Sequence, residues 1–219
     1  MDASPALVTV AIIIATVVVS ALGFRDEQVV RRFLFDVQAV RAGQLYRLFT
    51  AGFLHASLPH LLFNMFSFYS FARLIEQVYG PLPLALIYVA TILGGNLLAL
   101  AMHRNQVYRA LGASGGVCGV IFASIFLLPG GSVTVFPIPM AIPSWLFAIL
   151  FVVATGAGMR SGFGNIGHDA HLGGAIIGLL VTTALYPGIV ARSPALYGAV
   201  MALSLGLLIY TYRRPARRG

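Results

Sequence analysis

Three short polar clusters stand in an otherwise apolar sequence. They are His60-Leu61-Leu62-Phe63-Asn64, Gly112-Ala113-Ser114-Gly115-Gly116 and Asp169-Ala170-His171-Leu172-Gly173-Gly174. A serine hydroxyl is a weak nucleophile until a neighbouring base takes its proton, and a neutral histidine can be that base. Ser114 together with His171 therefore predicts acyl-transfer chemistry, such as the hydrolysis of a peptide bond.

That chemistry also needs hydrogen-bond donors for the oxyanion that forms when the hydroxyl attacks a carbonyl group. His60 and Asn64 are four residues apart, so on a helix they share one face and can direct donors to one point. The backbone N–H groups around Ala113 and Ser114 complete the candidate set.

The composition places these residues in a membrane protein. Of the 219 residues, 59% are hydrophobic and 9% are charged, whereas about a quarter of the residues in a soluble domain are charged. Long apolar runs predict transmembrane helices, because a helix satisfies its own backbone polar groups in lipid. We expect an all-α, polytopic helical membrane protein with seven spans, at about 6–24, 59–78, 82–102, 113–129, 143–158, 169–187 and 195–212.

The three polar clusters lie at the beginnings of the second, fourth and sixth predicted spans. Because successive spans alternate in direction, these beginnings are on the same side of the membrane and at a similar depth. Glycines at four-residue spacing favour close packing of the fourth and sixth spans, Gly115 with Gly119 and Gly174 with Gly178. The sequence thus predicts that the serine and the histidine meet.

Taken together, these motifs resemble the rhomboid family of intramembrane serine proteases. The features that carry the resemblance are His60-x-x-x-Asn64, Gly112-Ala113-Ser114-Gly115 and Ala170-His171-x-x-Gly174-x-x-x-Gly178. The resemblance covers spans two to six and implies a rhomboid-like six-helix core with one further helix. We therefore expect a single domain of residues 1–219, with core spans at about 6–187 and an additional C-terminal helix at about 195–212.

The resemblance also implies roles for individual residues. Ser114 is then the nucleophile and His171 the general base, while His60, Asn64 and the N–H groups at Ala113 and Ser114 hold the oxyanion. No cofactor and no metal is implied. The residues expected to give structural support are His55, Gly112, Gly115, Gly174 and Gly178.

Two residues near the dyad stand outside this scheme. Many family members place an aromatic ring four residues after the serine, where it stacks on the catalytic histidine, but this chain has Cys118 there. The apolar surroundings of Cys118 predict a small core residue and not a reactive thiol. Asp169 is two residues from His171, a spacing that faces away on a helix, so we expect a dyad without an acid.

The arginines leave the orientation in the membrane open. The family's active site opens to the extracytoplasmic side, an orientation that leaves only Arg73 and Arg192 of the arginines inside. The positive-inside rule predicts the reverse orientation. In either orientation, we expect an integral multi-pass protein of a prokaryotic cell membrane.

Three other functions fit parts of the sequence. A catalytically silent rhomboid-like protein would bind membrane clients without cleaving them. A bis-histidine haem protein would use His60 and His171 on facing helices, but it leaves Asn64 and Ser114 without a role. A transporter would line a path through the membrane with polar groups, which here gather at one level.

For the protease, the expected partners are transmembrane protein substrates and membrane lipids, and not nucleic acid. The basic residues near the C-terminus favour lipid headgroups, because a cluster of arginines next to a span meets anionic lipid. The sequence predicts no oligomeric state.

Overall fold

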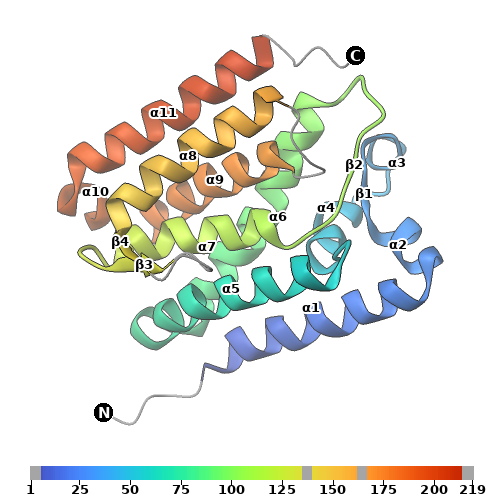
Figure 1. Ribbon diagram of the computed structural model, residues 1–219, viewed down its shortest axis with the longest axis horizontal. Coiled ribbons are helices and arrows are strands. Elements are labelled where there is room, and N and C mark those ends of the chain that lie inside the picture. Colours follow the sequence, from blue (N-terminus) through green and yellow to red (C-terminus); the bar gives the residue numbers. More distant parts are fainter. Residues whose placement is uncertain (1–5, 135–139, 162–166, 214–219) are drawn as a thin grey trace.

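The computed structural model describes residues 6–134, 140–161 and 167–213. Long helices packed side by side dominate it (Figure 1). Each predicted span overlaps one of them, so the all-α, polytopic fold is confirmed. The long helices of the described residues are α1 (Leu7–Arg25), α5 (Leu58–Tyr79), α6 (Pro81–Met102), α7 (Ser114–Leu127), α8 (Ser144–Ser161), α9 (His168–Leu185) and α11 (Pro194–Arg213).

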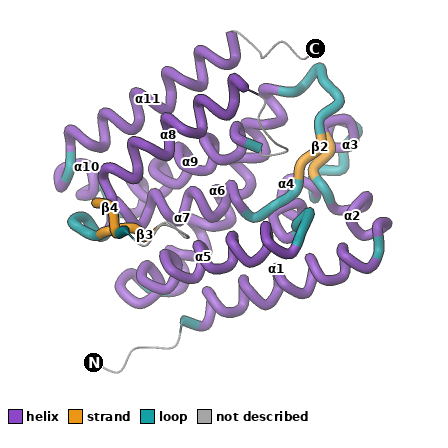
Figure 2. The backbone as a smooth tube through the Cα atoms, in the orientation of Figure 1, coloured by secondary structure: helices purple, strands orange, loops and turns teal. Residues whose placement is uncertain are grey.

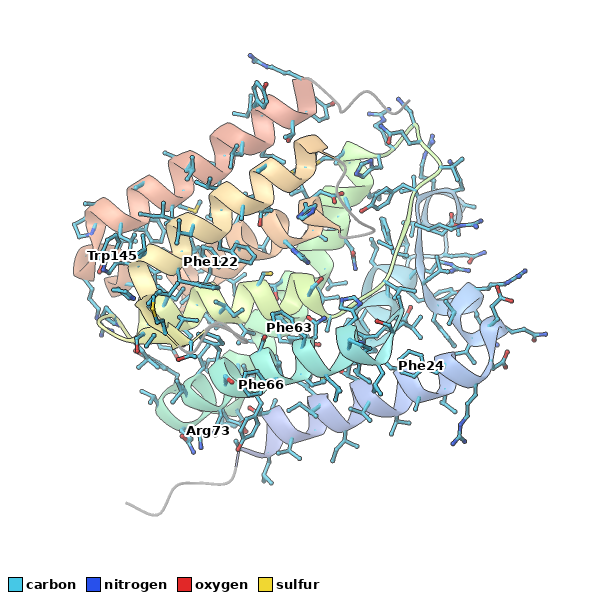
Figure 3. The ribbon with its side chains drawn as sticks, in the orientation of Figure 1. Phe24, Phe63, Phe66, Arg73, Phe122 and Trp145 are labelled. Atoms are coloured by element: carbon cyan, nitrogen blue, oxygen red, sulfur yellow. The ribbon has the colours of Figure 1, made fainter. Side chains whose placement is uncertain are left out.

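Length and composition alone qualify three of the described helices, α1, α6 and α11, to cross a membrane. The apolar helix α7 and the segment Ser144–Met159 of α8 are shorter. The outside of the bundle is rich in large apolar side chains, which suits contact with lipid tails. Figure 3 labels several of the exposed ones, namely Phe24, Phe63, Phe66 and Trp145.

Helix α7 forms the centre of the bundle. All of its residues from Gly115 to Leu127 are buried, and it packs against α5, α6, α8 and α9. Glycines let the neighbouring helices approach its backbone closely, which is how helices associate in lipid. The beginning of α7, where Ser114 lies, is therefore held from several sides.

Helix α1 lies at the edge of the bundle, on α5 (Figure 1), and its polar residues are turned inward. Its buried residues are Thr9, Thr16 and Ser20, whereas Leu22 and Val18 are exposed. This arrangement is the opposite of that in a soluble protein. Lipid solvates apolar side chains but leaves a polar group unpaired, so the polar groups of α1 find partners inside.

The connection between α1 and α5 is built from short elements. They are α2 (Glu27–Phe33), β1 (Phe35–Asp36), α3 (Val37–Arg41), α4 (Arg47–Thr50) and the 3-10 helix η1 (Ala51–Phe53). The buried guanidinium of Arg47 holds this segment together, because it donates to the carbonyl oxygens of Arg31 at 2.9 Å and Leu34 at 2.8 Å. A charged donor makes these bonds stronger than neutral ones.

Two short antiparallel strand pairs join the helices (Figure 2). Strand β1 pairs with β2 (Arg109–Ala110), and β3 (Ser132–Thr134) pairs with β4 (Ala141–Pro143). These strands are additions to the predicted helical fold, since two- and three-residue strands have no periodicity to reveal them in a sequence. The β1–β2 pair matters for the site because it ties the first connection to the segment that leads into α7. A further short helix, α10 (Gly188–Arg192), connects α9 to α11.

Candidate active site

The beginnings of α5, α7 and α9 lie at one end of the bundle, beside β1 and β2 (Figure 1). His60 is in the first turn of α5, Ser114 is the first residue of α7, and His171 is in the first turn of α9. The first N–H groups of a helix have no partner within that helix. The three polar clusters therefore meet where unpaired backbone donors are also present.

Glycines bring α7 and α9 into backbone contact. A Cβ atom on Gly115 would lie 3.2 Å from the carbonyl oxygen of Ala170, and one on Gly174 would collide with the Gly115 carbonyl group. One turn deeper, a Cβ atom on Gly178 would lie 2.6 Å from the Cα atom of Gly119. The residue that follows the serine thus touches the residue that precedes the histidine. Any side chain at these glycines would push the two helices apart.

A turn at Gly112 places Ser114 beside His60. Gly112 has a φ of 138°, which a residue with a side chain rarely adopts, and its N–H group donates to the carbonyl oxygen of Ala51 at 3.0 Å. A Cβ atom there would lie 3.0 Å from His60 Cε1 and 3.8 Å from Ser114 Oγ. The imidazole and the hydroxyl therefore border the same small space.

In the described part of the chain, no hydrogen bond joins Ser114 to the ring of His171. The His171 backbone N–H donates to the carbonyl oxygen of Gly167 at 3.1 Å. The imidazole lies among rings, with its centroid 6.3 Å from that of Phe151 and 6.0 Å from that of His168. Catalytic hydrogen bonds are often long without substrate and tighten when it binds. The backbones of α7 and α9 thus meet next to both residues, while the described side chains of Ser114 and His171 share no hydrogen bond.

Asn64 and His60 interact with each other along α5. The Asn64 side chain is 3% exposed, and its Nδ2 donates to the carbonyl oxygen of His60 at 3.0 Å. A primary amide has a second N–H, which this bond does not use. The His60 ring meets the ring of His55 edge to face, at 4.8 Å between centroids. The His60 ring is thus fixed beside the serine, and Asn64 is fixed one turn farther along α5.

His55 links α1 to the segment before the serine. Its Nε2 accepts the N–H of Ala113 at 3.4 Å, so the neutral ring carries its proton on Nδ1, which lies 3.0 Å from Ser20 Oγ. The Ser20 hydroxyl in turn donates to the carbonyl oxygen of Phe53 at 2.9 Å. Burial lowers the pKa of His55 to about 4, and the charge of the neighbouring His60 contributes a smaller part of this shift. The protein therefore holds this histidine neutral.

The Ala113 contact differs from the role expected from the sequence. The Ala113 N–H was expected among the oxyanion donors, but the structure directs it to His55. Of the two backbone donors considered, the Ser114 N–H at the beginning of α7 is the one that remains for an oxyanion.

Asp169 lies away from the dyad, as its helical spacing predicts. Its carboxylate binds His103 Nε2 at 2.7 Å and accepts the hydroxyl of Tyr108 at 3.2 Å. The rings of His103 and Tyr108 stack at 3.9 Å. This cluster joins the end of α6 to the beginning of α9. No sequence pattern predicts this cluster, because its contacts join residues far apart in the chain.

Two further expectations concern metals and the thiol. Within residues 6–134, 140–161 and 167–213, no group of three or more His, Cys, Asp or Glu side chains is placed to hold a metal ion. Cys118 is free and buried in α7.

Comparison with known proteins gives consistent matches. The family model for the Rhomboid domain matches residues 42–188 of this chain. The chain is 28% identical to RHOMBOID-like protein 12, mitochondrial, of Arabidopsis thaliana over 182 residues, which are 75% of this chain and 54% of that protein. It is also 28% identical to Rhomboid protease GluP of Bacillus subtilis over 182 residues, which are 82% of this chain and 34% of that protein.

A third relative is Rhomboid-like protein 11, chloroplastic, of Arabidopsis thaliana. It is 30% identical over 162 residues, which are 67% of this chain and 57% of that protein. The chain therefore spans between 34% and 57% of the length of these three relatives.

Proposed function

Because the chain belongs to the rhomboid family, we propose that this integral membrane protein is a serine endopeptidase that cleaves other membrane proteins in or beside their transmembrane segments. A relative that carries the name of a protease, Rhomboid protease GluP, supports the activity. In the proposal, Ser114 and His171 form the catalytic dyad. The lipid-exposed outside of the bundle suits a substrate that arrives within the membrane.

One observation carries the proposal. The beginnings of α7 and α9 are in backbone contact, with Gly115 against Ala170 and Gly174. Ser114 and His171 come from distant parts of the chain. The residue next to the serine, Gly115, contacts the residue next to the histidine, Ala170. The turn at Gly112 adds the imidazole of His60 to the same space. A site of this composition can supply a nucleophile, a base and donors for an oxyanion.

In the proposed reaction, His171 removes the proton of Ser114 as Oγ attacks the substrate carbonyl carbon. The C=O double bond opens to an oxyanion, which accepts hydrogen bonds from His60, the second N–H of Asn64 and the backbone N–H of Ser114. The C–N bond then breaks, and the leaving amine takes the proton from His171. Water hydrolyses the resulting ester on Ser114 with the same histidine as base, which restores both residues.

The open contact between Ser114 and His171 fits this scheme. We expect the hydrogen bond between them to form when a substrate excludes water from the site. A substrate helix must unwind locally to expose its scissile carbonyl, so we expect helix-breaking or small residues near the cut. We further propose a prokaryotic cell membrane as the location, and transmembrane proteins and membrane lipids as the partners.

The proposal is tested by cleavage of a tagged single-span substrate in liposomes. We expect the wild type to cut it, and Ser114→Ala and His171→Ala each to lower turnover by more than about 1,000-fold, because neither half of the dyad works alone. Thermal unfolding of both variants should match that of the wild type.

The matched control is Ser124→Ala, which makes the same change on a buried residue of the same helix, away from the other polar clusters. It should keep full turnover. Wild-type turnover in the Ser114→Ala or the His171→Ala variant would contradict the dyad.

The open dyad also favours a second function, that of a rhomboid-like protein that binds membrane clients without cutting them. In that case the well-folded wild type would cleave none of several substrates. It would retain the substrate on affinity capture from mixed liposomes, and Ser114→Ala would retain it equally. The same preparations therefore distinguish the two functions.

A further inference from the structure

Among the residues that the structure describes, no carboxylate binds and orients the imidazole of His171. The nearest acid in sequence, Asp169, is bound to His103 and Tyr108. In the described part of the chain, the His171 ring takes part in no hydrogen bond. A catalytic base usually needs a third group that keeps its ring in the productive orientation. Something other than an acid has to restrain this ring.

In the described part of the chain, two rings border His171, and they differ in how they can restrain it. His168 lies one turn earlier on the same helix, so it moves together with His171. Phe151 comes from α8, with its ring centroid 6.3 Å from that of His171 and the ring planes 33° apart. Only a neighbour from another helix can restrain the imidazole relative to the rest of the site.

Phe151 is itself held by the core. Its ring packs edge to face on Phe122, at 5.4 Å between centroids, and it contacts Phe147 at 5.9 Å. Phe122 belongs to the buried face of α7 and is 0% exposed (Figure 3). Aromatic pairs at such distances add to the stabilisation that burial gives. A row of rings therefore runs from α7 through α8 to the imidazole on α9.

The side chain at position 118 of α7 contributes no ring to this row. Cys118 lies one turn before Phe122 on α7, and it is small and buried. It presents no ring to the histidine, so the aromatic neighbour of His171 that comes from another helix is the one on α8.

We propose that Phe151 is a positioning residue for His171, and that its ring keeps the imidazole turned toward Ser114. The inference rests on the proposed protease function. It also makes α8 part of the catalytic geometry, because a movement of α8 away from α9 would release the imidazole. Phe151 itself touches neither the substrate nor the reacting atoms.

The test compares Phe151→Leu with Phe147→Leu. Both changes remove one partly buried ring from the same helix, but only Phe151 contacts His171. We measure kcat and KM for the tagged substrate in liposomes, together with the rate at which a fluorophosphonate probe labels Ser114. The probe reports activation of the hydroxyl without needing the natural substrate.

For Phe151→Leu, we expect kcat and the labelling rate to fall about three- to tenfold while KM stays unchanged, a loss of the size that one aromatic contact provides. Phe151→Tyr, which keeps the ring, should restore most of both rates. Phe147→Leu leaves Phe151 packed on Phe122, so it should keep most of both rates. Thermal unfolding should be similar for the two leucine variants.

The outcomes separate the inference from the function on which it rests. Equal losses in Phe151→Leu and Phe147→Leu, full activity in Phe151→Leu, or an effect on KM alone would overturn the positioning role while the protease stands. A wild type that neither cleaves nor reacts with the probe would overturn the proposed function, and the positioning role with it.

Discussion

Glu76 and the candidate dyad, which lie near opposite ends of the bundle, use their hydrogen-bonding groups in opposite ways. Near the end of α5, the carboxylate of Glu76 accepts three hydrogen bonds, from the N–H of Val8 at 2.8 Å and from the N–H and hydroxyl of Thr9 at 2.8 and 2.6 Å. At the opposite end, no hydrogen bond of the described residues uses the Ser114 hydroxyl or the His171 ring. Both oxygens of Glu76 are thus hydrogen-bonded, whereas the Ser114 hydroxyl and the His171 ring are available to bind other groups.

This difference follows from the solvent. In lipid, an unpaired polar group costs several kcal/mol, so a carboxylate inside the bundle stays only where it is fully paired. Glu76 caps the first N–H groups of α1 and thus joins α1 to α5. Polar groups with unused donors are tolerated where water or a substrate can supply partners. The saturated carboxylate of Glu76 therefore has a structural role, whereas the unused Ser114 hydroxyl and His171 ring are available for binding or catalysis.

The geometry around Ser114 and His171 depends on the spacing between α7 and α9, which Gly174→Ala would change. The new methyl group would meet the backbone carbonyl group of Gly115, which cannot rotate away, so α7 and α9 must separate. A displacement of about 1 Å can lower turnover by about 100-fold. We expect this loss in the liposome assay, together with a lower temperature of thermal unfolding.

Gly206→Ala provides the matched control, because nothing lies within 4 Å of a Cβ atom there. It should leave both turnover and unfolding unchanged. Normal turnover in Gly174→Ala would show that the contact between α7 and α9 does not set the geometry of the dyad.

A substitution at Glu76 should lower the stability of the fold without lowering catalytic turnover. Glu76→Gln keeps the shape of the side chain but replaces one acceptor oxygen by an NH2 group, which then faces N–H or O–H donors. Breaking hydrogen bonds to a buried charged group costs about 2 kcal/mol of unfolding free energy. Turnover per folded molecule should stay at the wild-type value.

The control for this change is Glu27→Gln on α2. Glu27 is 76% exposed and pairs with an exposed arginine, Arg31, so its loss should change stability by less than about 0.5 kcal/mol. Reversible unfolding in detergent micelles measures both variants. Equal stabilities of the two variants would remove the distinction between a saturated cap and a surface ion pair.

The helices could be predicted from the sequence because their signal is local. Long apolar runs gave all seven, and the four-residue glycine spacing pointed to the surfaces on which α7 and α9 meet. Contacts between residues far apart in the chain could not be predicted. Glu76 with Thr9, Asp169 with His103, and the ring of Phe151 on His171 have no spacing that reveals them.

The candidate site divides in the same way. The approach of Ser114 to the beginning of α9 follows from alternating spans and small residues, both of which are visible in the sequence. The hydrogen bond from the Ala113 N–H to His55 depends on how the first connection folds over α1. No local pattern predicts that fold, because the connection consists of elements only a few residues long.

His55 combines both features, because its two ring nitrogens are paired and its ring contacts His60 in the candidate site. Its lowered pKa predicts that stability depends on pH. Its pKa falls from 6.5 in the unfolded chain to about 4 in the folded protein. Between these values only the unfolded chain binds the proton, so stability is complete above pH 6.5 and is lost as the pH falls toward 4. The slope reaches about 1.4 kcal/mol per pH unit.

Unfolding free energies of the wild type and His55→Gln, measured in micelles from pH 7.5 to 4.5, isolate this contribution, because the variant cannot take up that proton. The wild type should lose more stability than the variant below pH 6.5, and parallel curves would show that burial and the neighbouring His60 do not hold His55 neutral.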